Sequence, residues 1–98
     1  MITVDFFEGN KGFVLSGHSG YSEAGSDIIC ASVSSAVYMV ANTLTDVIGC
    51  QADIKISDGF MNLQIRETTR ETDILIEGLR LHIDQLSQQY PQYVITKD

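Results

Sequence analysis

The stretch ADIKISDGFMNLQIRE, residues 52–67, decides the fold. Apolar and polar residues alternate through it on both sides of Asp58 and Gly59, a pair typical of two-residue hairpin turns. Strict alternation indicates that one face of a strand packs on a core while the other face contacts water. We therefore predict an antiparallel hairpin with strands at 52–57 and 60–67.

The residues before this hairpin predict a helix. Apolar side chains recur at steps of three and four through residues 29–48, which is the spacing of one helix face. Ser26 or Asp27 is suited to cap the amino end of this helix. We expect the helix to run to about Val47 and to stop at Gly49.

A second helix and a short strand follow the hairpin. Thr69 or Thr72 is suited to begin this helix, whose apolar stripe repeats at three and four residues, and Pro91 marks its end. Residues 93–96 are rich in β-branched and aromatic types and predict a last strand.

The amino-terminal part predicts another hairpin, with strands at 2–8 and 12–17 and a turn near Gly9 and Asn10. The segment 18–26 has no period and reads as a loop. The element order is therefore β-β-α-β-β-α-β, and two amphipathic helices are enough to cover one sheet face. We predict an α+β two-layer sandwich with a mostly antiparallel sheet.

Three apolar side chains of the first hairpin cannot all point to one face of the sheet. We therefore expect part of its outer face to be buried against a second subunit. The three residues are Phe6, Phe7 and Val14.

Composition limits the classes of function. The chain has 98 residues, the size of one domain (1–98), and 44% of them are apolar, which is typical of a globular protein. A net charge of −7 argues against a nucleic-acid-binding surface and suits a basic protein partner. We find no signal peptide and no apolar run near the ~20 residues of a membrane span, so we expect a cytoplasmic protein.

The chain contains two cysteines, Cys30 and Cys50, and two histidines, His18 and His82. Their spacing matches neither a disulfide framework nor a zinc motif, so we expect no metal and no other cofactor. We interpret Cys50 as a small side chain at a helix end. His82 lies beside the apolar stripe of the second helix, where a boundary histidine is the simpler interpretation.

Cys30 is a candidate nucleophile because of its expected position. With Asp27 as the cap, Cys30 is the third residue of the first helix turn, where free N–H groups and the helix dipole stabilise a thiolate or an oxyanion. His18, twelve residues upstream, would reach the sulfur if the intervening loop reverses the chain, and would act as a base. A cysteine on a helix is also a common core residue, so spacing alone leaves both interpretations open.

Residues 17–44 resemble the ribosomal-processing cysteine protease (Prp) family. The hallmark of this family is a Gly-His pair, a glycine-containing loop, and an Asp-apolar-apolar-Cys-Ala segment that begins a helix. This hallmark is present here as Gly17, His18, Gly25 and residues 27–31. The twelve-residue spacing between the histidine and the cysteine matches as well, and the length and element order resemble the family over the whole chain.

The resemblance implies a cysteine endopeptidase that removes a short N-terminal extension from the precursor of large-subunit ribosomal protein twenty-seven, cutting after an aromatic pair. It also implies that Cys30 is the nucleophile, that His18 is the general base and that the enzyme is a homodimer. The acidic charge suits a strongly basic ribosomal protein. The alternatives are a non-catalytic ribosome-associated adaptor that binds that basic protein, and a one-cysteine redox sensor.

Several neighbouring residues have two open interpretations. Asp27 would either orient the His18 ring or cap the helix. Ser34, one turn after Cys30, would hydrogen-bond the thiol or the substrate, or bond to a carbonyl of its own helix. The loop has the composition of a mobile lid over the substrate, and its candidate substrate-binding residues are Gly20, Tyr21 and Gly25.

Overall fold

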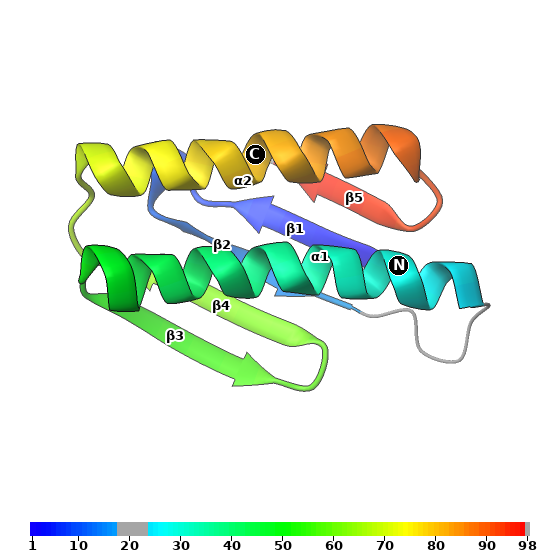
Figure 1. The fold of residues 1–98 in the computed structure, drawn as a ribbon, viewed down its shortest axis with the longest axis horizontal. Coiled ribbons are helices and arrows are strands. Elements are labelled where there is room, and N and C mark those ends of the chain that lie inside the picture. Colours follow the sequence, from blue (N-terminus) through cyan, green and yellow to red (C-terminus); the bar gives the residue numbers. More distant parts are fainter. Residues whose placement is uncertain (18–23, 98) are drawn as a thin grey trace.

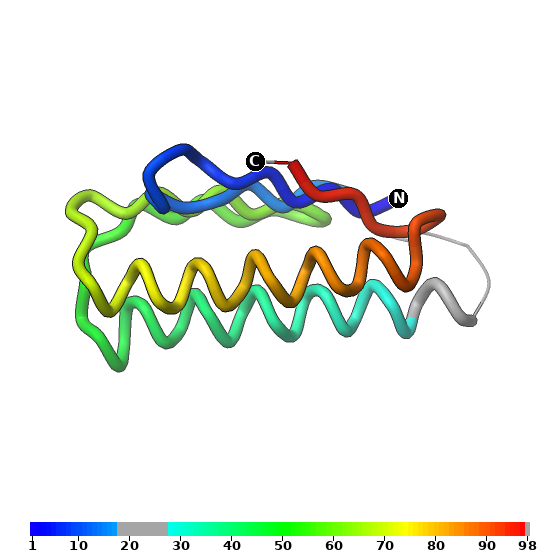
Figure 2. Tube along the Cα trace, turned by 90° about the horizontal axis from the view of Figure 1, so that it is seen from above, coloured from blue at the N-terminus to red at the C-terminus, as the bar shows by residue number. Residues whose placement is uncertain are grey.

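The protein consists of a five-stranded sheet and two long helices that cover one face of it (Figure 1). The computed structural model describes the backbone of residues 1–17 and 24–97, and the side chains of all of these except 24–27. The strands are β1 (Ile2–Phe6), β2 (Gly12–Ser16), β3 (Ala52–Ser57), β4 (Phe60–Ile65) and β5 (Val94–Lys97), and the helices are α1 (Ala24–Asn42) and α2 (Arg70–Gln89). The predicted α+β two-layer sandwich is confirmed, and Figure 2 shows its two layers edge-on.

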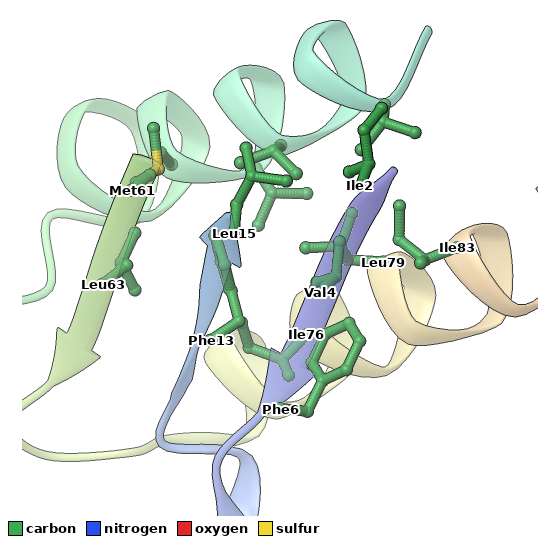
Figure 3. Close-up of a cluster of buried hydrophobic side chains, with 14 of the residues drawn as sticks. Ile2, Val4, Phe6, Phe13, Leu15, Met61, Leu63, Ile76, Leu79 and Ile83 are labelled. Carbon is green, nitrogen blue, oxygen red and sulfur yellow. The ribbon is translucent and has the colours of Figure 1, made fainter. Parts of the chain in front are cut away.

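The strand order in the sheet is β3-β4-β2-β1-β5. All neighbours are antiparallel except β1 and β5, which run parallel. Helix α2 contacts β5, and α1 therefore lies over the strands toward the other edge of the sheet, β2 and β4 (Figures 1 and 3). The strand β3 is an edge strand.

The core lies between the sheet and the two helices (Figure 3). It contains alternate side chains of the three central strands together with one stripe from each helix. Burial of each aliphatic or aromatic side chain contributes about 1.5–3 kcal/mol before the cost of ordering the chain. The core residues on strands and helices include Ile2, Val4, Phe6, Phe13, Leu15, Met61, Leu63, Ile65, Val33, Val37, Val40, Ile76, Leu79 and Ile83.

The three apolar residues of the first hairpin separate as strand alternation requires. Phe6 is buried, and its ring lies 6.3 Å from that of Phe13 between centroids. Val14 pairs with Asp5 on the outer face and is half-buried, while Phe7 follows the end of β1 and is also half-buried. Burial of this outer face against a second subunit stays a prediction.

The start of α2 follows the predicted capping chemistry. The Thr69 hydroxyl accepts a hydrogen bond from the Thr72 N–H at 3.2 Å, and the Thr72 hydroxyl accepts one from the Thr69 N–H at 2.8 Å. These two bonds form a reciprocal capping box, so both predicted starting residues take part. The helix ends at Gln89, two residues before Pro91, as expected.

The predicted start of α1 at Ser26 or Asp27 is wrong, because the helix begins at Ala24. Alanine is the strongest helix former, and an acidic residue such as Asp27 is as favourable in a first turn as at a cap. Gly25 and Asp27 therefore lie within the first turn of α1, and residues 24–26 of the predicted loop belong to this helix.

The carboxyl end of α1 continues as a π-helical turn, Thr43–Ile48, and stops at Gly49, which has a left-handed φ of 78°. Helical structure thus reaches one residue beyond the predicted end, and Gly49 is the predicted stop. The segment Ile28–Ile48 is long and apolar enough to cross a membrane by length and composition, with a mean hydropathy of 1.5. The expectation that no segment has this property is wrong. One face of the segment packs on the sheet, since Val33, Val37 and Leu44 are fully buried.

Candidate active site

Cys30 lies on α1 and is partly buried against the margin of the core. It is the seventh residue of the helix, not the third. Only the first four N–H groups of a helix lack an intrahelical acceptor, so the N–H of Cys30 is not one of the free donors that the sequence suggested. The expectation that the free N–H groups of the helix terminus form an oxyanion hole at Cys30 is therefore wrong.

The two flanks of α1 have different neighbours. Ala36 and Met39 lie on the flank toward α2, where they line a groove with residues of that helix. Val33 and Val37 face the sheet. Helical spacing places the row of Cys30 and residues 34 and 38 on the remaining flank, which is turned away from α2 and toward β4 and β3.

Gly17 fixes the point at which the chain leaves β2. Its φ is +93°, and its N–H donates a hydrogen bond to the Gly59 carbonyl at 2.9 Å. A Cβ atom at this position would lie 2.2 Å from the carbonyl oxygen of Met1. Only glycine fits here without a shift of the backbone, so the glycine of the Gly-His pair has a steric reason.

The sequence-predicted site residues are described to different extents. Cys30 and Ser34 are described fully, and Ser34 is half-buried on the flank that carries Cys30. Gly25 and Asp27 are described as helical backbone. His18, Gly20 and Tyr21 lie outside the described residues, so their predicted roles as base and substrate-binding residues stay predictions.

Cys50 lies at the opposite end of the molecule from Cys30. It follows the π-helical turn, and its N–H donates to the Leu44 carbonyl at 3.0 Å. Cys30 precedes Ile48 by eighteen residues of helix, which corresponds to roughly 25 Å along the axis. Burial raises the pKa of the Cys50 thiol, which is typical of a packed cysteine and not of a nucleophile.

Gly17 lies at the same end of the sheet as the beginning of α1. In the register of β2 with β4, Ser16 pairs with Phe60, beside the hairpin turn, and Gly12 pairs with Gln64 near the other end. Cys50 lies two residues before the start of β3 at that other end. The carboxyl end of β2 and the amino-terminal part of α1 therefore lie at the same end of the molecule (Figure 1).

His82 is exposed on α2 and lines the groove between the helices. Cys50 shares a cavity with Thr69 at the start of α2, and His82 is thirteen residues further along, or about 20 Å along the helix axis. The groove has a volume of about 410 Å³ and lies on the flank of α1 opposite Cys30. Cys50 and His82 are thus too far apart to act as a pair.

Most of the charged stretch 66–73 is exposed, although Thr72 within it is fully buried. The Arg66 guanidinium donates to both carboxylate oxygens of Asp53, at 2.9 and 3.2 Å, and holds the pKa of that carboxyl below its usual range. Both side chains are exposed, so the ion pair contributes little stability. Among residues 1–17 and 28–97, whose side chains the structure describes, there is no cluster of three or more His, Cys, Asp or Glu residues that could hold a metal ion.

The sequence pattern of the cysteine protease Prp family matches residues 1–95. The chain belongs to this family. It is therefore a cysteine protease with the predicted fold. Curated relatives named ribosomal processing cysteine protease Prp are 23% identical over 101 residues in Staphylococcus aureus, covering 96% of this chain and 95% of the relative, and 24% identical over 90 residues in Bacillus subtilis, covering 85% and 80%.

Solved structures of similar proteins have the same fold as this Prp family member. A crystal structure of the ribosomal processing protease Prp from Staphylococcus aureus with a covalently linked product peptide has a TM-score of 0.85 at 21% identity, covering 99% of this chain and 98% of that one. The protein SMU.848 from Streptococcus mutans has a TM-score of 0.83 at 28% identity, covering 98% and 90%.

Tyr38 and Ile56 are two of the exposed apolar residues, and neither is among the site residues predicted from the sequence. Ile56 lies at a position of the strand where the alternation predicts a buried side chain. The sequence therefore does not indicate that the helices leave Ile56 exposed. Tyr38 follows Cys30 by eight residues, and the i, i+4, i+8 spacing of Cys30, Ser34 and Tyr38 indicates that they share one flank of the helix.

Proposed function

We propose that this Prp family member cleaves peptide bonds with Cys30 as the nucleophile and His18 as the general base. The observation that carries the proposal is that Cys30 and Gly17, the residue before His18, lie at one end of the molecule. Cys50 shares a cavity with Thr69 at the start of α2, and His82 lies about 20 Å further along that helix. No alternative pair in the described structure has a comparable placement.

In the proposed reaction His18 takes the proton of the Cys30 thiol, and the thiolate attacks the carbonyl carbon of the scissile bond. The imidazolium then gives the proton to the leaving amine, and a thioester to Cys30 remains. Water, deprotonated by His18, hydrolyses the thioester and restores the thiol. We propose that Asp27 orients His18, because the structure does not place it at the N-cap. The proposed substrate contacts are made by Ser34, Gly20, Tyr21 and Gly25.

The proposed substrate is the precursor of large-subunit ribosomal protein twenty-seven, cut after an aromatic pair in its N-terminal extension. Two observations support it: the curated relatives are named ribosomal processing proteases, and this chain has a net charge of −7 that attracts a basic protein. We place the reaction in the cytoplasm and the enzyme in a homodimer. Fractionation of cells and light scattering at micromolar concentration test these two points.

The test uses a peptide that spans the proposed cut, with mass spectrometry to locate the cleaved bond. We expect cleavage after the aromatic pair, and its loss in Cys30→Ala and in His18→Ala. The matched controls are Cys50→Ala and His82→Ala, which should keep the wild-type rate. Loss of cleavage in Cys50→Ala with retention in Cys30→Ala would refute the assignment.

A second variant, Asp27→Asn, tests the orienting role. We expect a large fall in kcat with an unchanged melting temperature, because an amide cannot stabilise the imidazolium. An unchanged kcat would remove Asp27 from the mechanism without affecting the assignment of Cys30.

A further inference from the structure

The inner face of β3 is the part of the sheet that the helices leave uncovered. Ile56 is 55% exposed, although it pairs with Met61 of β4, which points to the same face and is 1% exposed. Ile54 is only half-buried, whereas its partner Leu63 is fully buried. The cover provided by α1 therefore ends over β4, and a strip of apolar sheet remains open at the edge.

The flank of α1 that carries Cys30 faces the same edge of the sheet. Tyr38 follows Cys30 by two helix turns on this flank and is 44% exposed. At a rise of 1.5 Å per residue, the two residues are separated by about 12 Å along the helix, which an extended peptide spans with about four residues. A chain that passes Cys30 along the helix therefore reaches Tyr38 within a short distance.

The main chain of β3 also has hydrogen-bonding groups at this edge. Among the residues that the structure describes, β3 pairs with β4 alone. Ser57 and Phe60 flank a two-residue turn, so their main chains hydrogen-bond to each other. In an antiparallel pair, hydrogen-bonded and non-hydrogen-bonded residue pairs alternate along the strands. The N–H and C=O groups of Ile54 and Ile56 therefore point away from β4. An extended polypeptide has the complementary groups.

We propose that the polypeptide substrate lies in extended form along the Cys30 flank of α1 and beside β3, with an apolar side chain about four residues from the scissile bond packed against Tyr38 and Ile56. This surface, made of Tyr38, Ile54 and Ile56, is called the β3 strip below. The proposal rests on the proposed function, because it takes Cys30 as the nucleophile.

The substrate is the occupant that the charges and the activity favour. A cysteine protease must hold a polypeptide at its thiol, and the β3 strip is continuous with the flank that carries Cys30. The net charge of −7 attracts a basic substrate, whereas it provides no such attraction for a second acidic copy at the β3 strip. The groove between the helices lies on the opposite flank of α1 and cannot extend the site at Cys30.

The test is a cycle of enzyme and substrate variants measured by steady-state kinetics. Ile56→Ser should raise KM about tenfold and leave kcat within about twofold, because the contact is made equally before and during reaction. The control is Ile95→Ser on β5, the opposite edge strand, where Ile95 is 37% exposed and KM should not change. Melting temperatures of both variants establish that they are folded.

The substrate arm replaces each apolar residue up to four positions on either side of the cut by serine. One of these replacements should raise the wild-type KM about tenfold and have no further effect in Ile56→Ser, since the two changes remove the same contact. Additive effects, or an unchanged KM in Ile56→Ser, overturn the β3 strip while cleavage dependent on Cys30 stands. A lower molecular mass of Ile56→Ser with unchanged KM assigns the strip to a second copy instead. Absence of cleavage dependent on Cys30 overturns both proposals.

Discussion

Replacement of three glycines by alanine separates two costs that the structure predicts for Gly17. A side chain at Gly17 would meet both an unfavourable φ of +93° and the Met1 carbonyl oxygen at 2.2 Å. At Gly49 the φ is +78° and nothing lies within 4 Å of the added Cβ. At Gly78, within α2, the added Cβ also has open space and the backbone is helical.

The expected changes in the free energy of unfolding follow from these differences. Gly78→Ala should stabilise the protein by about 0.5–1 kcal/mol, because alanine loses less backbone entropy in a helix. Gly49→Ala should destabilise it by about 1–2 kcal/mol through the left-handed backbone alone. Gly17→Ala should cost about 3 kcal/mol or more, since the backbone must also move to relieve the contact.

Thermal unfolding followed by circular dichroism measures this series. A change of 1 kcal/mol corresponds to about 4–8 °C in a domain of this size, so the order Gly78→Ala, wild type, Gly49→Ala, Gly17→Ala spans well-resolved melting temperatures. Peptide cleavage should fall in Gly17→Ala beyond what its stability explains, because Gly17 leads directly into His18. A Gly17→Ala variant with the melting temperature and kcat of the wild type would falsify the steric reasoning.

Three further predictions concern the packing and the thiols. Thr69→Ala should lower stability by about 1 kcal/mol through loss of the cap, whereas Thr69→Ser should keep most of it, as urea unfolding can measure. Leu63→Ala should cost about 2–5 kcal/mol because Leu63 is fully buried, and a loss below about 1 kcal/mol would show that the core refills the cavity. Alkylation of Cys50 by iodoacetamide should be slower than that of a free thiol at pH 8 and should accelerate at higher pH, because burial raises its pKa. A Cys50 that mass spectrometry finds modified as fast as glutathione would contradict this.

Local patterns predicted most of the fold. The hairpin around Asp58 and Gly59, the cap at Thr69 and the stop at Gly49 each depend on residues close in sequence, so their physics is visible in the sequence. The start of α1 was missed because Ser26 and Asp27 are equally suited to a cap and to a first turn.

The candidate site was less accessible to sequence reasoning. The alternation of apolar and polar residues assigns Ile56 to a buried face. Whether a helix covers the edge strand β3 depends on which strands the two helices lie over, and this is a tertiary property. The steric role of Gly17 arises from a contact with Met1, sixteen residues away, which no local pattern records. Likewise, the placement of Cys50 far from Cys30 follows from the length of α1 and its π-helical turn.

The parallel pairing of β1 with β5 has a consequence for how the molecule forms. Ile2 pairs with Val94 and Thr3 with Ile95, so the first strand finds one of its two partners about ninety residues later in the chain. Until then the free side of β1 is an open strand edge on a partly formed sheet, which is prone to pair with other chains. Pairing over such a sequence separation slows folding and makes it depend on the complete strand order. The enzyme should therefore gain its activity only once β5 has been made and has paired with β1, and a chain truncated before β5 should aggregate instead of retaining partial activity.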